Sequence, residues 1–370
     1  DSYFGKEANL MKKIFIYFIL LSVIAGLFWV GCDMEPSRVN GPNTEVQSLG
    51  KVALPDVALA RIMAIQNEHT PKIMEISGVI GTATGHGPLG TPAVIVFTES
   101  PGVTGIPSNL DGVPVIVRVT GKIYALPKPD KPGKPDKPGD EEPQDPIDPT
   151  SRFDRPVPIG VSTGHPNITA GTIGARVTDG TNVYALSNNH VYAVENNANI
   201  GDAVIQPGTY DGGTSPVDDI GTLAGFEPIA FDGSENTIDA AIALTSIESL
   251  GNSTPSDGYG VPKITPVTPK INLKVMKYGR TTGQTNGKIY ALNATVDVGY
   301  DSGTARFVNQ IVIIPGTFSG GGDSGSLVIS NDRKSIKQPV GLLFAGNSTF
   351  TIANPIDTVL ESFGVTIDGE

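Results

Sequence analysis

The stretch SGGGDSGSLVIS, Ser319 to Ser330, decides how the rest of the sequence is interpreted. Glycines, an aspartate and serines come directly before an apolar run, so the stretch is either a flexible turn that leads into a β-strand or a loop that holds a nucleophile. A serine hydroxyl is a weak nucleophile at neutral pH and needs a base, usually histidine, and a group that orients the base. The choice therefore depends on the histidines and acids elsewhere in the chain.

The chain has four histidines, and His190 lies in the most suitable context. It ends the run VYALSNNH, where an apolar strand meets a polar asparagine pair, and a histidine at a strand end can lean over a cleft. A buried structural histidine explains this segment equally well when it is taken alone. The other three occupy polar or turn contexts and are expected to be surface residues: His69, His86 and His165.

The acid that would orient His190 is expected to be Asp239, in the segment NTIDAAIALT. Asp239 comes directly before an apolar run, so its carboxylate is expected to be buried and to need a partner. Asp219, in PVDDIGTL, is the alternative. The neighbouring Asp218 and the flanking turns favour a solvated loop acid at position 219. We therefore expect Asp239, and not Asp219, to contact the histidine.

The glycine-rich loop itself has the properties of an anion-binding turn. Its glycines permit positive φ angles and close approach of a ligand, and the successive backbone N–H groups from Gly322 to Ser324 can surround an anion. A phosphate-binding loop is excluded because no GK[ST] follows. A GxSxG nucleophile elbow is excluded because Ser326 stands where the second glycine belongs.

Four segments together resemble a known family. LSNNHVYA, TIDAAIAL and GGGDSGSLV resemble the three catalytic motifs of the trypsin-like serine peptidases, in the chain order His, Asp, Ser, over about Thr172 to Gly346. KYGRTTGQTNGKI is similar to the GRTTG segment of the bacterial α-lytic protease and streptogrisin branch. The spread of motifs also resembles bacterial relatives of the plant narrow-leaf trypsin-like proteins.

The resemblance implies a fold and a reaction. The fold would be mainly β, with two antiparallel β-barrels, the site in the crevice between them and a C-terminal helix outside. The reaction would be that of a serine endopeptidase on a protein or peptide, without a cofactor or metal. The implied catalytic residues are His190, Asp239 and Ser324, with the backbone N–H groups of Gly322 and Ser324 as the oxyanion hole.

The GRTTG segment implies a further pair. Its arginine, Arg280, would pair with Asp323, the acid directly before the candidate serine. An acid in a packed glycine loop needs a cation, and a bidentate guanidinium would hold the loop in its working shape. Arg280 and Asp323 are therefore expected to support the site.

The sequence also departs from the family pattern. The half-cystines that brace those enzymes are absent, and Ser326 replaces the last glycine of GDSGG. Phe344 stands where the family strand that pairs with substrate usually begins with serine. Phe344 and Gly346 are expected to contact the substrate, and Phe344 would narrow the non-primed subsites or change the support for Asp239. A catalytically silent trypsin-like fold that acts as a cell-envelope binding module is therefore the alternative function.

Composition agrees with a mainly β protein that does not bind nucleic acid. The 370-residue chain has a formal net charge of −12, which would repel phosphate backbones. It contains 45 glycines and 30 prolines but only 6% aromatic residues, which favours many tight turns and short strands over long helices. The sequence carries no indication of an oligomeric state.

The segment 11–31 is expected to be an export signal, because two lysines precede an uncharged run that ends in a glycine. It resembles a bacterial lipoprotein signal, which implies lipidation of Cys32, the chain's single cysteine, and a lipid anchor in the membrane of the cell envelope. Trp29 departs from the usual leucine of that signal. Ordinary cleavage with secretion, or a retained membrane anchor, therefore stays open.

The rest of the chain divides into four expected parts. Residues 32–50 form a polar tether, and 51–126 a small α+β domain with a helix that starts near Pro55. Residues 127–157 form a proline-rich linker that spaces two domains, and 158–370 form the peptidase domain with a final helix capped by Asn354. Because it precedes the peptidase domain, the small domain is also a candidate for a pro-region-like unit, either an inhibitor or a folding assistant.

The hexamer GKIYAL occurs twice, at Gly121–Leu126 and at Gly287–Leu292. Two copies of one short strand do not make a repeat architecture, and we interpret the second copy as a coincidence. The alternative is that the first copy mimics a strand of the second domain.

Overall fold

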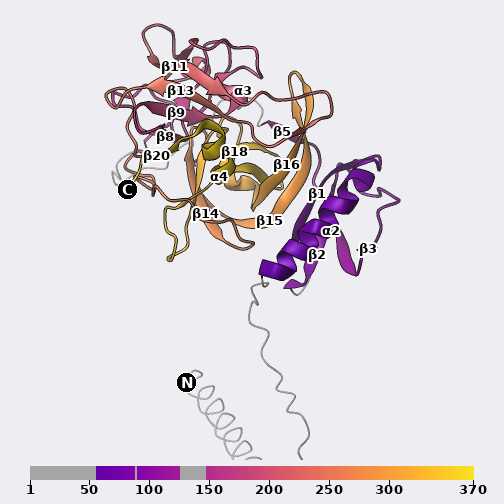
Figure 1. The fold of residues 1–370 in the computed structure, drawn as a ribbon. Coiled ribbons are helices and arrows are strands. Elements are labelled where there is room, and N and C mark those ends of the chain that lie inside the picture. Colours follow the sequence, from indigo (N-terminus) through magenta and orange to yellow (C-terminus); the bar gives the residue numbers. More distant parts are fainter. Residues whose placement is uncertain (1–55, 88–89, 126–146) are drawn as a thin grey trace, which may run out of the picture. The chain divides into compact units, whose positions relative to one another are not determined.

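The computed structural model describes residues 56–87, 90–125 and 147–370 (Figure 1). The predicted export signal, the lipidation site Cys32, the tether and most of the proline-rich linker lie outside these residues. Among the described residues, no helix is both long enough and apolar enough to span a bilayer. All of them belong to the second of the chain's two compact units, residues 51–370.

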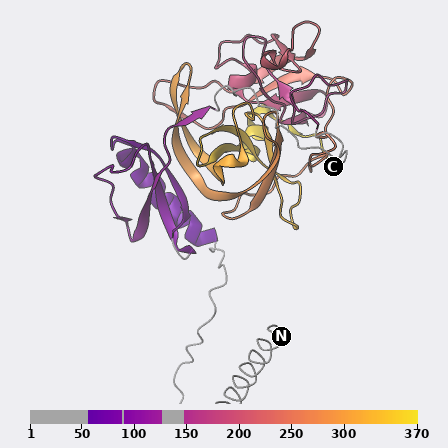
Figure 2. The same cartoon turned by 180° about the vertical axis from the view of Figure 1, so that it is seen from behind.

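The C-terminal barrel is a closed ring of antiparallel strands. Its buried apolar residues belong mainly to two clusters, one around Phe307 and Phe344 and one around Ile311 and Leu343. The strand β15 is strongly curved in both views, which lets it follow the ring (Figure 1 and Figure 2). Around the ring the strands are β14 (Lys274–Gly279), β15 (Gly283–Tyr300), β16 (Gly303–Ile314), β19 (Thr351–Pro355), β18 (Pro339–Gly346) and β17 (Leu327–Ser330), which returns to β14.

The N-terminal barrel closes in the same way with shorter strands. The bridge between Gly164 and Ile205 joins its first strand to β10 and completes the ring. In ring order the strands are β6 (Ser162–Thr163), β7 (Gly171–Thr172) with β8 (Ala175–Thr178), β9 (Val183–Ser187), β13 (Ala241–Thr245), β11 (Asp219–Phe226) and β10 (Ala203–Ile205). The predicted mainly β fold with two antiparallel barrels is confirmed.

The C-terminal helix α4 (Ile356–Phe363) is present, and its buried face joins the core of the N-terminal barrel. The last strand, β20 (Thr366–Ile367), then pairs with β8. The predicted cap is wrong, because Pro355 and not Asn354 is the N-cap residue. Asn354 is still in β19, and its side chain binds the backbone of Asp239 instead of the helix start.

The small N-terminal part has the predicted α+β composition. Helix α2 (Asp56–Met74) packs on a sheet, with Ile62 and Ile65 facing Val94 and Val96. The strands of this sheet are β1 (Val79–His86), β2 (Pro92–Thr98), β4 (Val113–Val119) and the short β3 (Asn109–Leu110).

This small sheet is continuous with the C-terminal barrel. Strand β1 pairs antiparallel with β15, for example Gly81 with Val296. The proline-rich linker predicts two separated domains, but the shared ladder makes them one sheet. The composition of the linker gives no information on this pairing, because strand pairing is set by the register of the strands themselves.

A second connection is strand β5 (Ile123–Ala125), within the first copy of GKIYAL. It runs parallel to β15, with Tyr124 beside Gly299, and antiparallel to β18, with Tyr124 opposite Gly346. The second GKIYAL copy lies within β15, and its residues pair with β14, β16 and β1. The first copy therefore pairs with strands of the second domain, but with other strands than the second copy does, and the interpretation as a mimic stays a prediction.

The main difference from the predicted strands is the β15–β16 hairpin. The sequence predicts only two short strands here, over 287–292 and 310–314, but the hairpin strands cover Gly283–Tyr300 and Gly303–Ile314. Its register shifts at several points, and Asn293 and Asn309 have positive φ angles of 54° and 60°. Such bulges interrupt the alternation of apolar and polar residues by which a strand is recognised in a sequence.

Candidate active site

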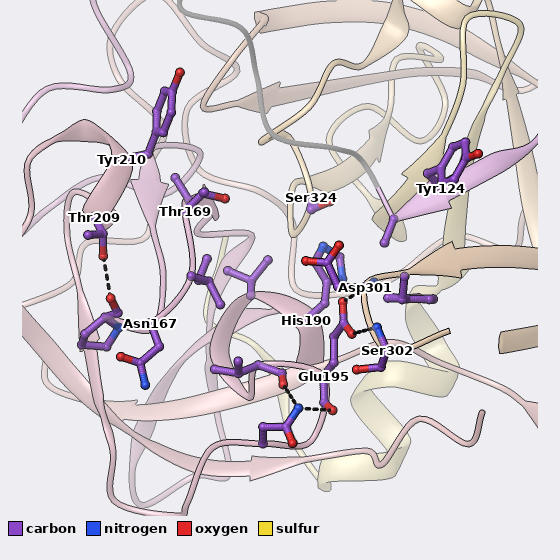
Figure 3. A pocket seen from close by; sticks show the side chains of 18 of the residues that line it. Tyr124, Asn167, Thr169, His190, Glu195, Thr209, Tyr210, Asp301, Ser302 and Ser324 are labelled. Carbon is purple, nitrogen blue, oxygen red and sulfur yellow. Dashed lines mark hydrogen bonds between the residues drawn. The ribbon is translucent and has the colours of Figure 1, made fainter. Parts of the chain in front are cut away.

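Three elements from the two barrels meet at one pocket, which His190 and Ser324 both line (Figure 3). His190 lies in the single turn α3 (Asn189–Tyr192), directly after β9. Asp239 comes just before β13 of the same barrel. Ser324 lies in the turn between the short helix η3 (Gly316–Phe318) and β17 of the other barrel. The barrels thus bring together the three residues that the sequence singled out.

Asp239 is completely buried and is held by hydrogen bonds to its side chain and backbone. Its Oδ2 accepts hydrogen bonds from His190 Nδ1, at 2.5 Å, and from the Tyr300 hydroxyl, at 2.9 Å. Its backbone carbonyl accepts from Asn188 Nδ2 at 2.7 Å and from Asn354 Nδ2 at 3.1 Å. A buried carboxylate with this many donors is fixed in position.

The rival acid lies in another place. Asp219 begins β11 and makes no contact with His190. Asp219 is half-buried, not fully solvated as expected, and its neighbour Asp218 is buried and accepts a hydrogen bond from Arg152 Nε at 2.6 Å. This ion pair holds the pKa of Asp218 below its usual value. Of the two candidate acids, only Asp239 contacts the histidine.

The second ring nitrogen of His190 is free. Nε2 is buried and has no hydrogen-bond partner among the described residues. The Ser324 hydroxyl, on a side chain that is almost fully buried, donates to the carbonyl of Phe344 at 3.3 Å. Hydrogen bonds between catalytic groups are often long or unformed before a substrate binds. With Nδ1 donating to Asp239, Nε2 carries the lone pair that can accept a proton.

The backbone amides of Gly322 and Ser324 have no acceptor in the described part of the chain, and the same holds for those of Ser319 and Gly321 in this loop. The loop is otherwise well bonded, since the amides of Gly320, Asp323 and Gly325 all donate within it or to neighbouring strands. Gly322 has a φ of 91°, which favours glycine. Two free N–H groups two residues apart form a site for a developing negative charge.

The predicted pair between Arg280 and Asp323 is wrong. Asp323 pairs instead with Lys277, whose Nζ lies 3.3 Å from Oδ2, and both side chains are completely buried. Residues of a strand point alternately to its two sides, so Lys277 and Gly279 share the side of β14 that faces Asp323, and Arg280 does not. A Cβ on Gly279 would lie 2.6 Å from Asp323 Oδ1. Burial lowers the pKa of Lys277, and Asp323 opposes this shift.

Arg280 binds an acid of the other barrel. Its guanidinium donates to Asp211 from two nitrogens, with Nε 2.8 Å from Oδ2. It also lies over the ring of Tyr210, 5.3 Å from the centroid. A Cβ on Gly322 would meet Arg280 Nη1 at 3.2 Å. Arg280 therefore packs under the glycine-rich loop and connects it to the N-terminal barrel without pairing with its acid.

The side chain of Phe344 does not reach the pocket. It is completely buried and packs on Phe307, with ring centroids 4.8 Å apart. The expectation that Phe344 narrows the cleft is therefore wrong for its side chain, because this ring is buried in the apolar cluster around Phe307. Gly346 lies further along the same strand, opposite Tyr124 of β5.

Within the described residues, the side chains of the remaining histidines form no hydrogen bond or ion pair with His190, Asp239 or Ser324. His165 is buried, contrary to the expected surface position, and its Nε2 lies 3.3 Å from Asp202. His69 pairs with Asp111 at 2.8 Å. Within residues 56–87, 90–125 and 147–370, no group of three or more His, Cys, Asp or Glu side chains is placed to hold a metal ion.

Sequence reasoning missed three residues that surround the triad candidates: Lys277, Tyr300 and Asn354. Lys277 interrupts the apolar run of β14, and an interrupting lysine in a buried strand is a signal for an internal acid partner. Tyr300 and Asn354 give no local signal, because their contact with Asp239 exists only once the barrels are packed.

Comparison with known proteins gives likeness in structure only. No protein-family model and no curated protein matches the chain. Among solved structures, it is similar to a glutamic-acid-specific serine protease (21% identity, TM-score 0.42, covering 57% of this chain and 100% of that one). It is also similar to protease A of Thermobifida fusca (20%, 0.42, 58% and 100%) and to a chymotrypsin of Cellulomonas bogoriensis (22%, 0.40, 59% and 100%).

The buried pair predicts a large stability effect at Lys277. Lys277→Met leaves the Asp323 carboxylate buried without its cation, so we expect the free energy of unfolding to fall by about 3–5 kcal/mol. Lys263→Met is the matched control, because Lys263 pairs with Glu370 on the surface, where the side chains are 43% and 56% exposed. Its effect should stay below about 1 kcal/mol. Denaturant unfolding measures both, and equal losses would contradict the assignment.

Proposed function

We propose that this chain is a serine endopeptidase. The observation that carries the proposal is the hydrogen bond from His190 Nδ1 to the buried Asp239, with Nε2 unpaired and buried at a pocket that Ser324 also lines. The unpaired amides of Gly322 and Ser324 supply the remaining requirement, a site for an oxyanion.

The residues fit a two-step acyl transfer. Ser324 Oγ attacks the peptide carbonyl while His190 Nε2 takes the hydroxyl proton, and Asp239 stabilises the resulting imidazolium. The carbonyl oxygen becomes an oxyanion that accepts hydrogen bonds from the amides of Gly322 and Ser324. His190 then gives the proton to the leaving amine, and water attacks the acyl group on Ser324 by the same route to release the acid.

The alternative, a silent fold that acts as a binding module, was motivated by a possible block at Phe344. The buried position of that ring removes this motive. Within the described residues, the candidate base His190 is bonded to its orienting acid Asp239 and keeps Nε2 free. The two oxyanion amides are also free, and this arrangement suits catalysis. The peptidase is therefore the better supported of the two functions.

A fluorophosphonate probe should label the protein at Ser324, because the probe reacts only with a serine that a base activates. Ser324→Ala and His190→Ala should each abolish labelling. Ser319→Ala is the matched control and should keep it, since the Ser319 hydroxyl binds Thr351 at 2.6 Å. Mass spectrometry of the labelled peptide locates the adduct. Labelling that survives Ser324→Ala would remove the proposal, and absence of both labelling and casein hydrolysis would favour the binding module.

A second role is favoured for the small N-terminal part, that of a built-in inhibitor. The resemblance implies that the substrate-pairing segment begins at Phe344, near the end of β18, and β5 pairs with the two residues that follow, Ala345 and Gly346. Tyr124 and Ala125 line the same pocket as His190 and Ser324 (Figure 3). An extended segment that adds to a strand edge in this way competes with a peptide that would use the same edge. Because it belongs to the same chain, its effective concentration is high.

This inhibition predicts that weakening β5 activates the protein. Both edges of β5 are paired, so Tyr124→Pro has to remove a ladder hydrogen bond. We expect hydrolysis of a short peptide substrate to rise about fivefold or more, since one such bond is worth about 1 kcal/mol. Thr104→Pro, in an exposed loop of the same part, is the control. Equal rates for the two variants would show that β5 does not restrict the site.

We also propose export with a lipid anchor at Cys32, supported by the sequence pattern alone. In a bacterial host grown with an alkyne-bearing palmitate analogue, the full chain should be labelled and should sediment with membranes, because acylation adds buried CH₂ groups. Cys32→Ser should abolish both. Label on the Cys32→Ser variant, or none on either chain, would contradict the anchor and leave secretion.

A further inference from the structure

The hydroxyl that supports Asp239 comes from Tyr300, at the end of β15 in the C-terminal barrel. Its OH lies 2.9 Å from Asp239 Oδ2, the same oxygen that accepts the bond from His190 Nδ1. The Tyr300 ring also packs edge-on against the His190 ring, with centroids 5.9 Å apart. Tyr300 thus contacts both members of the acid–base pair without reaching Ser324.

The tyrosine is held from several sides. Its ring packs against Phe231, at 5.7 Å between centroids, and against Phe307, at 6.1 Å. Phe307 in turn packs on Phe344, so the phenylalanine that replaces the usual serine of β18 helps to fix a hydroxyl that comes from another strand. Residues in such a cluster lose little further freedom when they make a hydrogen bond.

The hairpin tip beyond Tyr300 is tied to the barrel that carries His190. The backbone amides of Asp301 and Ser302 donate to the carboxylate of Glu195, at 3.2 and 2.8 Å (Figure 3). Glu195 follows α3 in the chain. The Tyr300 hydroxyl therefore reaches the N-terminal barrel from a hairpin that is held by the aromatic contacts of its ring and by the hydrogen bonds of its tip to Glu195.

Tyr300 stays a donor at any working pH. Burial raises its pKa well above the usual value of 10, and the negative charges of Asp239 and Glu195 raise it further. Asp239 can accept two donors at Oδ2 without protonation, so the tyrosine hydroxyl and the imidazole share one carboxylate oxygen. The hydrogen bond from either donor reduces the negative charge of the Asp239 carboxylate that the other donor experiences.

We propose that Tyr300 is a positioning residue of the site, whose hydroxyl fixes the Asp239 carboxylate and lowers the basicity of His190. The role rests on the proposed peptidase function. Its support is the shared oxygen, the edge-on contact with His190 and the replacement of the usual serine by Phe344.

Tyr300→Phe tests this role in the full chain, because it removes only the oxygen. We expect kcat on a peptide substrate to fall about tenfold, since one hydrogen bond to a charged group is lost, with KM changed less than about twofold. The pKa of the acidic limb of kcat/KM should rise, because Asp239 then acts on His190 alone. Tyr184→Phe is the matched control, since it removes a Tyr–Asp bond of 2.8 Å to Asp179, away from the site.

A second measurement does not depend on activity. In the Ser324→Ala background, the His190 Nδ1 proton should give a far-downfield NMR resonance, and the ring should titrate at a higher pH when Tyr300→Phe is added. Tyr184→Phe should leave both unchanged. Identical titration and identical kcat in the Tyr300→Phe and Tyr184→Phe variants would overturn the role. If the unaltered protein is not labelled at Ser324, the peptidase function fails, and the titration still decides whether Tyr300 tunes His190.

Discussion

The buried carboxylate of Asp239 is the constraint on which the rest of the site depends. A carboxylate without water costs several kcal/mol unless donors replace the lost hydration. Here the donors to the carboxylate come from His190 in α3 of one barrel and from Tyr300 at the end of β15 of the other, while Asn354 holds the Asp239 backbone. Satisfying one charge therefore fixes the two barrels against each other, and the same bonds leave one nitrogen of His190 free for chemistry.

A second buried charge, Asp323, does the same for the loop that carries Ser324. Lys277 of β14 neutralises it from within the same barrel, and the amides of Thr281 and Thr282 donate to it. The loop is thus held by Lys277, Thr281 and Thr282. Gly322 can then keep its positive φ with its amide directed to no protein acceptor, which is the state that an oxyanion needs.

The sequence predicted the mainly β fold and singled out His190, Asp239 and Ser324, because each sits in a local pattern of strand end, apolar run or glycine turn. It misassigned the cation of Asp323, since a short motif pointed to Arg280 and only strand alternation selects Lys277. Tyr300 was out of reach, because it lies 61 residues from Asp239 and meets it only through barrel packing. The full length of β15 was also not predicted, because the alternation of apolar and polar residues is interrupted where the β15–β16 register shifts.

The most direct test of the account is a crystal structure of the chain with a peptide aldehyde. The account predicts a covalent bond from Ser324 Oγ to the aldehyde carbon, the new oxygen within hydrogen-bond distance of the amides of Gly322 and Ser324, and His190 Nε2 close to Ser324. An adduct on Ser319 or Ser326, or an aldehyde bound without a covalent bond and with the two amides unpaired, would contradict it.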